Sequence, residues 1–89
     1  MILYTGDPEN VTEAVRTMAE KERAQGRKTG IIDFNGDAQE AARLFFARLR
    51  ALDKEGVDLI ICAGVPEKGI GESVMDRMRK AAGENIVCV

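Results

Sequence analysis

The chain alternates between short apolar runs and longer segments in which apolar residues recur every three or four positions. The apolar runs span residues 2–5, 29–34, 57–64 and 85–89. Continuous runs of this kind are typical of strands that are covered on both faces of a sheet. The three longer segments lie between the runs, and their period predicts amphipathic helices. The pattern therefore predicts four strands separated by three helices.

Capping residues set the bounds of the predicted helices. Asp7 suits an N-cap, and Pro8 suits the first helical position. Asp37, followed three residues later by Glu40, resembles a capping box. A glycine follows each periodic segment, as at the ends of many helices. The predicted helices therefore cover residues 8–25, 38–55 and 72–82, and they end before Gly26, Gly56 and Gly83.

The alternation of strands and helices predicts one α/β domain over residues 1–89, with a parallel sheet and right-handed crossovers. We expect a Rossmann-like or flavodoxin-like fold of three layers, with a four-stranded sheet in the order 2-1-3-4 and three helices. In that order the first helix covers one face of the sheet, and the other two helices cover the opposite face. One helix cannot cover four strands, so we expect a bare apolar face near the third and fourth strands. Such a face usually marks an interface, which predicts a homodimer or a partner domain.

Composition and charge exclude several classes of protein. The net charge is −2, whereas a domain that binds nucleic acid usually presents a basic stripe. No apolar run reaches the roughly 18 residues of a membrane span, and no signal peptide is evident, so we expect a cytoplasmic protein without membrane contact. The chain has no histidine, so neither a structural zinc site nor a Ser–His or Cys–His pair is expected, and we predict no catalytic or metal-binding residue. Cys62 and Cys88 lie in predicted strands and are expected to be buried, reduced thiols.

Open parallel sheets bind ligands at the carboxyl ends of their strands. In the turn before the third helix, Gly69 and Gly71 could let a phosphate approach the helix N-terminus, with Ser73 as a donor. The turn is neither a G-x-G-x-x-G motif nor a P-loop, so an ordinary tight turn is the alternative. If a ligand binds, we expect ATP or another nucleotide with Mg²⁺. The expected contact residues are Thr5, Gly6, Gly64, Gly69, Gly71 and Ser73.

Acidic residues near the ends of the first two strands offer a second kind of site. Asp7, Asp33 and Asn35 would gather at one edge of the sheet, where oxygen ligands could hold Mg²⁺. Two simpler interpretations compete, because Asp7 suits a helix N-cap and Asp33 could merely end its strand. No lysine stands at the end of the third strand to complete a phospho-acceptor site like that of response regulators.

Three motifs in the second half of the chain resemble the C-terminal domain of threonylcarbamoyl-AMP synthase. They are A-R-L-F-F-A-R-L-R-A-L-D at residues 42–53, G-V-D-L-I at residues 56–60, and G-I-G-E-S-V-M-D-R-M-R-K-A-A-G at residues 69–83. Their order and register follow the family pattern, which is roughly A-x-x-L-F-x-x-L-R-x-L-D, G-x-D-x-I and G-[LI]-G-x-[AS]-[IV]-M-N-R-[LM]-x-K-A-A. The sequence departs from this pattern at Asp76, where the family usually has asparagine.

The resemblance implies a Rossmann-like domain of an enzyme that makes threonylcarbamoyl-adenylate for a modification of tRNA. In that family the chemistry belongs to a separate N-terminal domain, whose motifs this sequence lacks. We therefore expect a non-catalytic accessory domain, which dimerises or contacts a synthase catalytic domain and does not bind tRNA directly. A nucleotide or phosphorylated-metabolite sensor is the alternative. The candidate interaction residues are Phe46, Arg50, Asp53 and Arg77, although Arg50 and Asp53 could also form a weak pair on a solvated face.

Overall fold

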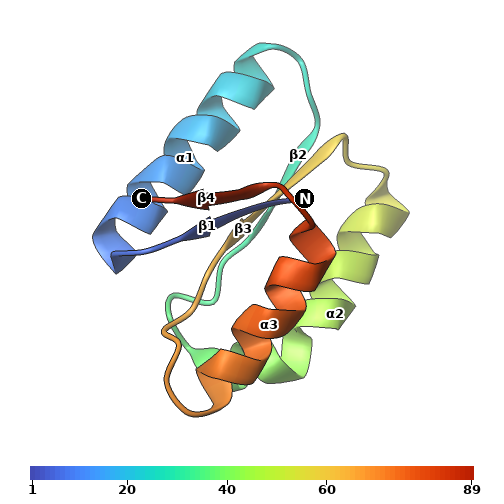
Figure 1. Cartoon of the computed structure of the whole chain (residues 1–89). Helices are drawn as coiled ribbons and strands as arrows, with labels where there is room; N and C mark the ends of the chain where they lie inside the picture. The colour runs from blue at the N-terminus through green and yellow to red at the C-terminus, as the bar shows by residue number, and fades with distance from the viewer.

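The computed structural model describes all 89 residues, and its elements follow the predicted order (Figure 1). The strands β2, β3 and β4 are slightly shorter than predicted, and α3 begins at Ile70 and not at Glu72. The elements are β1 Ile2–Thr5, α1 Pro8–Ala24, β2 Thr29–Ile32, α2 Ala38–Glu55, β3 Leu59–Ala63, α3 Ile70–Ala82 and β4 Ile86–Cys88.

The predicted aspartate N-caps are both present. The Asp7 carboxylate accepts the backbone N–H two residues on at 3.0 Å, and the Asp37 carboxylate accepts that of Glu40 at 3.0 Å. The capping box of α2 is incomplete, because the Asp37 N–H donates to the Phe34 carbonyl and not to the Glu40 side chain. Gly56 ends α2 in the left-handed conformation, with φ 71°. Local sequence signals thus define the helices well.

The sheet is wholly parallel, as predicted, but its strand order is β2-β3-β1-β4 and not the expected 2-1-3-4. Hydropathy indicates only that β1 and β3 are interior strands, and both orders satisfy that condition. Polar contacts just before β2 and β3 distinguish the two orders. The Asp58 carboxylate accepts the Lys28 N–H at 2.9 Å, and the Lys28 carbonyl accepts the Asp58 N–H at 2.7 Å. These bonds join the beginnings of β2 and β3 and make them neighbours.

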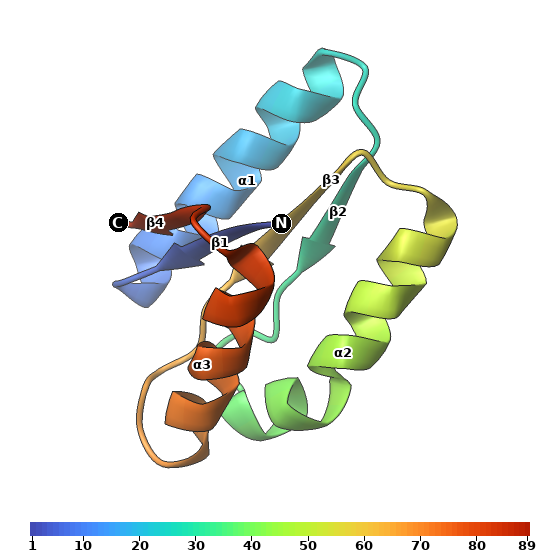
Figure 2. The ribbon, with the colours of Figure 1, turned by 45° about the vertical axis from the view of Figure 1, so that its right-hand side comes forward.

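The three helices lie on the predicted faces of the sheet (Figures 1 and 2). Both strand orders give this arrangement, because each sends the β1–α1–β2 crossover in one direction and the other two crossovers in the opposite direction. None of the helices is both long and apolar enough to cross a bilayer. The core under α1 contains Tyr4, Val11, Val15, Ala19, Ile61 and Ala63. The larger core under α2 and α3 includes Leu3, Ile32, Phe45, Cys62, Met75 and Met78.

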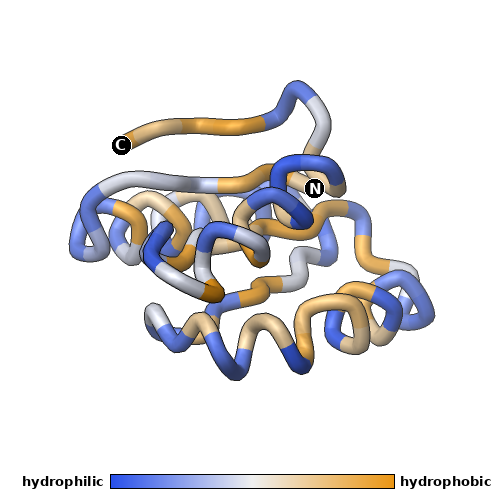
Figure 3. Tube along the Cα trace, turned by 60° about the horizontal axis from the view of Figure 1, so that its bottom comes forward, coloured by the Kyte–Doolittle hydropathy of each residue, from blue (hydrophilic) through white to orange (hydrophobic).

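The bare part of the sheet is β4 alone, and the expectation that β3 would also be bare is wrong. Ile61 of β3 is fully buried and Ala63 is 3% exposed, because β3 lies between β2 and β1 and packs against α1. Every residue of β4 is exposed, with Ile86 and Val87 at 39% each. Figure 3 shows the hydrophobic residues of this strand at the outer edge of the molecule, with no other segment beyond them.

Candidate functional site

A cavity of about 440 Å³ opens at the carboxyl ends of β1, β2 and β3. Three loops and the first turns of α1 line this cavity. Gly6 comes from the β1–α1 loop and Pro8 begins α1, Asp33 and Asn35 follow β2, and residues 63–68 run from the end of β3 into the β3–α3 loop. The volume falls within the range of about 300–1,000 Å³ that is usual for small-molecule sites.

The cavity lies where the connections of the sheet diverge. From β1 the chain crosses to α1 on one face, whereas from β3 it crosses to α3 on the opposite face. Because β1 and β3 are neighbours in the sheet, a crevice forms between their carboxyl ends, where Gly6 and Gly64 lie. Open parallel sheets bind ligands at such points, so the cavity is the candidate site of this domain.

Two of the six residues predicted to contact a ligand, Gly6 and Gly64, line the cavity. At the start of α3, the Gly71 amide donates to the Lys68 carbonyl at 3.0 Å, and the next amide along the chain donates to the Gly69 carbonyl at 3.2 Å. These two amides are therefore engaged within the protein. The predicted residues outside the cavity are Thr5, Gly69, Gly71 and Ser73.

Of the three residues considered for a Mg²⁺ site, one caps a helix and the other two line the cavity. Asp7 caps α1 and does not line the cavity, whereas Asp33 and Asn35 do. No group of three or more histidine, cysteine or acidic side chains is arranged around a common point. Sequence reasoning missed Lys68, which also lines the cavity. Lys68 stands several residues beyond β3, and only the path of the β3–α3 loop brings it to this site.

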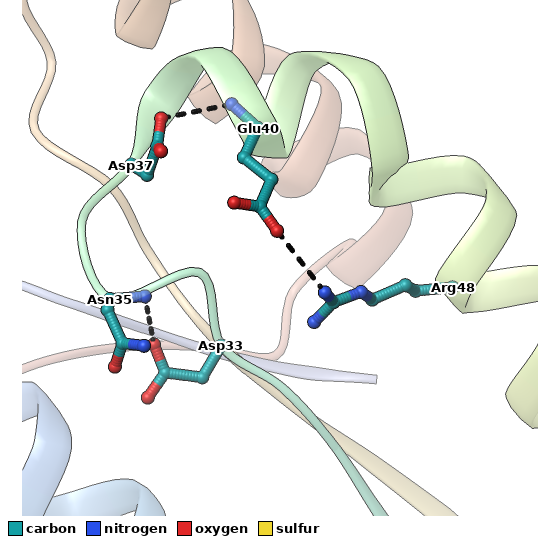
Figure 4. Close-up of polar contacts among 5 residues, drawn as sticks. All are labelled: Asp33, Asn35, Asp37, Glu40 and Arg48. Atoms are coloured by element: carbon teal, nitrogen blue, oxygen red, sulfur yellow. Dashed lines mark hydrogen bonds and ion pairs between the residues drawn. The ribbon is translucent and has the colours of Figure 1, made fainter.

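Asp33 is the polar group of the cavity with the best-defined geometry (Figure 4). Its Oδ1 atom accepts the Asn35 backbone N–H at 2.8 Å, and Asn35 itself has φ 52°. No cation forms an ion pair with Asp33. The nearby Arg48 is engaged elsewhere, because it pairs with Glu40 at 3.5 Å and lies 4.6 Å from the centroid of the Phe34 ring. The Asp33 carboxylate therefore presents an uncompensated negative charge to the cavity.

The two cysteines differ in environment, which corrects the expectation that both are buried. Cys62 is buried in β3, whereas Cys88 is exposed, because β4 is an uncovered edge strand. Burial, and after it the charge of Asp33, raises the pKa of Cys62 to about 12. An unfolded cysteine ionises near pH 8.5, so Cys62 stabilises the folded state below that pH. This contribution is lost as the pH rises from about 8.5 towards 12.

In the native protein we expect one fast-reacting thiol, that of Cys88. The Cys62 thiol should react only after unfolding, because it is both buried and protonated at pH 8. Ellman's reagent, added with and without guanidinium chloride, measures the number of reactive thiols. Cys88→Ser is the control and should remove the fast phase. Two fast thiols in the native wild-type chain would contradict the buried position of Cys62.

The four candidate interaction residues, Phe46, Arg50, Asp53 and Arg77, all lie at the surface. The ring of Phe46 is 46% exposed. The weak pair considered for Arg50 and Asp53 does not form, and neither these two residues nor Arg77 takes part in any ion pair. Their charges remain free to contact another molecule.

Comparisons with known proteins match nearly the whole chain to one protein family. The family described as threonylcarbamoyl-AMP synthase, C-terminal domain, matches residues 1–83. The chain is 36% identical to a threonylcarbamoyl-AMP synthase of Pyrococcus abyssi over 100 aligned positions, which cover all of this chain and 29% of that protein. The chain thus spans less than a third of the length of the curated relatives that it matches.

Solved structures agree with this placement. The P. abyssi Sua5 structure with L-threonine superposes with a TM-score of 0.91 at 34% identity, covering 99% of this chain and 29% of that one. The C-terminal Sua5 domain of Pyrococcus horikoshii gives a TM-score of 0.79 at 32% identity, and here the match covers 94% of the other chain. The chain belongs to the family of threonylcarbamoyl-AMP synthase C-terminal domains.

Proposed function

We propose that this domain is a non-catalytic accessory module in the threonylcarbamoyl modification of tRNA, and that it acts by binding a synthase catalytic domain. Membership in the family of synthase C-terminal domains supports the process. The length of the relatives supports the partner, because the chain covers only 29% of the P. abyssi synthase. The rest of such an enzyme is long enough to hold the catalytic domain that this domain would contact.

The unprotected edge strand β4 carries the proposal. Alternate residues of a parallel strand direct their backbone groups to the same neighbour. The Val89 N–H and the Asn85 carbonyl both bond to β1, at 2.8 and 2.9 Å. The alternation therefore turns the Ile86 carbonyl and both backbone groups of Cys88 outward. An added strand of a partner could pair with these groups.

The side chains of β4 present apolar surface on both faces of the sheet. Ile86 is in register with Leu3, and Val87 with Tyr4, and these two partners belong to the cores on opposite faces. Ile86 therefore points to the side of α3 and Val87 to the side of α1. Natural edge strands are usually protected by lysine or proline, and β4 contains neither. This composition is typical of an edge that another protein segment covers.

Replacing Val87 with lysine should weaken binding to a separately produced synthase catalytic domain by about tenfold or more, because it places a charge on the proposed apolar contact. Isothermal titration calorimetry measures the affinity. Ile31→Lys is the matched control, since Ile31 is 37% exposed and Val87 is 39% exposed. Ile31 lies on β2, at the opposite edge of the sheet, so its replacement should leave the affinity unchanged.

The alternative partner is a second copy of the chain, and light scattering coupled to size-exclusion chromatography distinguishes the two. A dimer that Val87→Lys dissociates, without binding to the catalytic domain, would assign β4 to self-association. Binding that survives Val87→Lys but is lost with Ile31→Lys would place the contact at the β2 edge of the sheet and would contradict a contact at β4. A monomer that ignores the catalytic domain would contradict the accessory role.

A further inference from the structure

The cavity at the carboxyl ends of β1, β2 and β3 is separate from the proposed docking edge, because no residue of β4 lines it. We propose that this cavity binds a compact zwitterion of the α-amino acid class. The ammonium group of the ligand would meet the Asp33 carboxylate, and its carboxylate would meet Lys68. This inference does not depend on the partner proposed for the domain.

Asp33 supplies the recognition of a cation. Its side chain is half-buried at the rim of the cavity, and only its Oδ1 atom is engaged, by the Asn35 N–H. The Oδ2 atom remains free to accept a hydrogen bond from a ligand. A charged donor is favoured there, because hydrogen bonds between an ammonium and a carboxylate are roughly twice as strong as neutral ones.

The charge of Asp33 is not neutralised by an ion pair within the protein. The negative charge of Asp33 contributes to the raised pKa of the Cys62 thiol. The arginine on the nearby part of α2, Arg48, is held by Glu40. A ligand ammonium would therefore meet a negative potential without a competing side chain.

Lys68 supplies the opposite charge from the β3–α3 loop. It lines the same cavity and forms no ion pair. The acidic residue beside it, Glu67, is paired with Arg79 at 2.6 Å. The lining of the cavity thus contains one free carboxylate and one free ammonium group. A molecule with both an ammonium and a carboxylate group complements this pair of charges.

The remaining lining selects a small ligand and disfavours a nucleotide. Val11 and Val65 are buried apolar residues of the wall, which suit a short aliphatic side chain. A nucleotide would bring several negative charges to a cavity that already contains Asp33 and has Lys68 as its one cation. The Gly71 amide and the next amide along the chain are bonded within the protein at the start of α3.

Nuclear magnetic resonance titration of the whole chain tests the proposal. The probes are L-alanine and L-threonine as zwitterions, ethylamine and acetate as the separate charges, and ATP with Mg²⁺. We expect saturable amide shifts at Gly36, Gly64 and Lys68 with the amino acids, and at least about tenfold weaker binding of ethylamine, acetate and ATP. Saturation by ATP at lower concentration than by either amino acid would overturn the assignment.

Asp33→Asn is the decisive variant. It should lower the affinity for the amino acids by about tenfold or more, because the amide cannot pair with an ammonium. The fold should persist, since the asparagine oxygen can still accept the Asn35 N–H. Asp76→Asn is the matched control, because Asp76 lies on α3 outside the cavity and only pairs with Lys80 at the surface. Equal affinities of the wild type and Asp33→Asn, or amide shifts centred outside the cavity, would refute the site.

Discussion

Truncating Phe45 to alanine is expected to lower the free energy of unfolding by about 3–5 kcal/mol. The Phe45 ring is 2% exposed and belongs to the larger core, where α2 packs against the sheet. At the usual stability per residue, a domain of this length has a free energy of unfolding of about 4–13 kcal/mol. The substitution therefore removes a large share of the total. Urea denaturation followed by circular dichroism measures the loss.

The adjacent Phe46 provides a matched control for that experiment. Phe46 has the same side chain on the same helix, and its ring centroid lies 5.2 Å from that of Phe45. It is 46% exposed, so Phe46→Ala should cost less than about 1–1.5 kcal/mol. The dependence of the unfolding free energy on urea should stay the same in both variants. Equal losses in the two variants would contradict the orientation of α2 on the sheet.

The elements of this fold are predictable because their signals are local. Asp7 and Asp37 cap helices through bonds to amides two or three residues away, so a short window of sequence contains all the information needed. The same holds for Gly56, which ends α2 through its own backbone conformation. The faces on which the helices lie follow from the handedness of the crossovers.

The strand order is not predictable in this way, because it depends on contacts between distant residues. The bonds between Lys28 and Asp58 join segments 30 residues apart, and hydropathy contains no information about them. The error in the order had a further consequence for the bare surface. Because β3 lies between β1 and β2, the two strands that α1 connects, α1 covers it and the uncovered region shrinks to β4. Cys88 lies on this exposed strand.

The position of the candidate site was predictable, but its chemistry was not. Parallel strands bring their carboxyl ends to one edge, which places Gly6 and Gly64 together in either strand order. The role of Gly69 and Gly71 at the start of α3 depends on where their amides point, and the structure shows the Gly71 amide bonded to the Lys68 carbonyl. The free charges of Asp33 and Lys68 could be recognised only once the competing ion pairs were known.

Gly71→Ala is expected to lower the free energy of unfolding by about 1–3 kcal/mol, which is opposite in sign to the effect of helix propensity. Alanine is normally favoured over glycine within a helix by roughly 0.5–1 kcal/mol, and Gly71 has no positive φ that would forbid a side chain. A β-carbon at this position, however, would overlap the Pro66 carbonyl oxygen and lie 3.5 Å from the Ala38 side chain. No rotamer change relieves a clash with a backbone atom, so α3 or the β3–α3 loop must move.

The Gly56→Ala variant distinguishes this steric clash from the backbone strain that any residue other than glycine has at a positive φ. Gly56 has φ 71°, but a β-carbon there would meet open space, so the variant should lose about 1–2 kcal/mol from its left-handed conformation alone. Both variants should therefore be less stable in urea, but only Gly71→Ala should shift the amide resonances of residues 63–68. A gain in stability for Gly71→Ala would mean that the Pro66 carbonyl moves aside at little cost. Such a gain would contradict the tight packing of α3 against the β3–α3 loop.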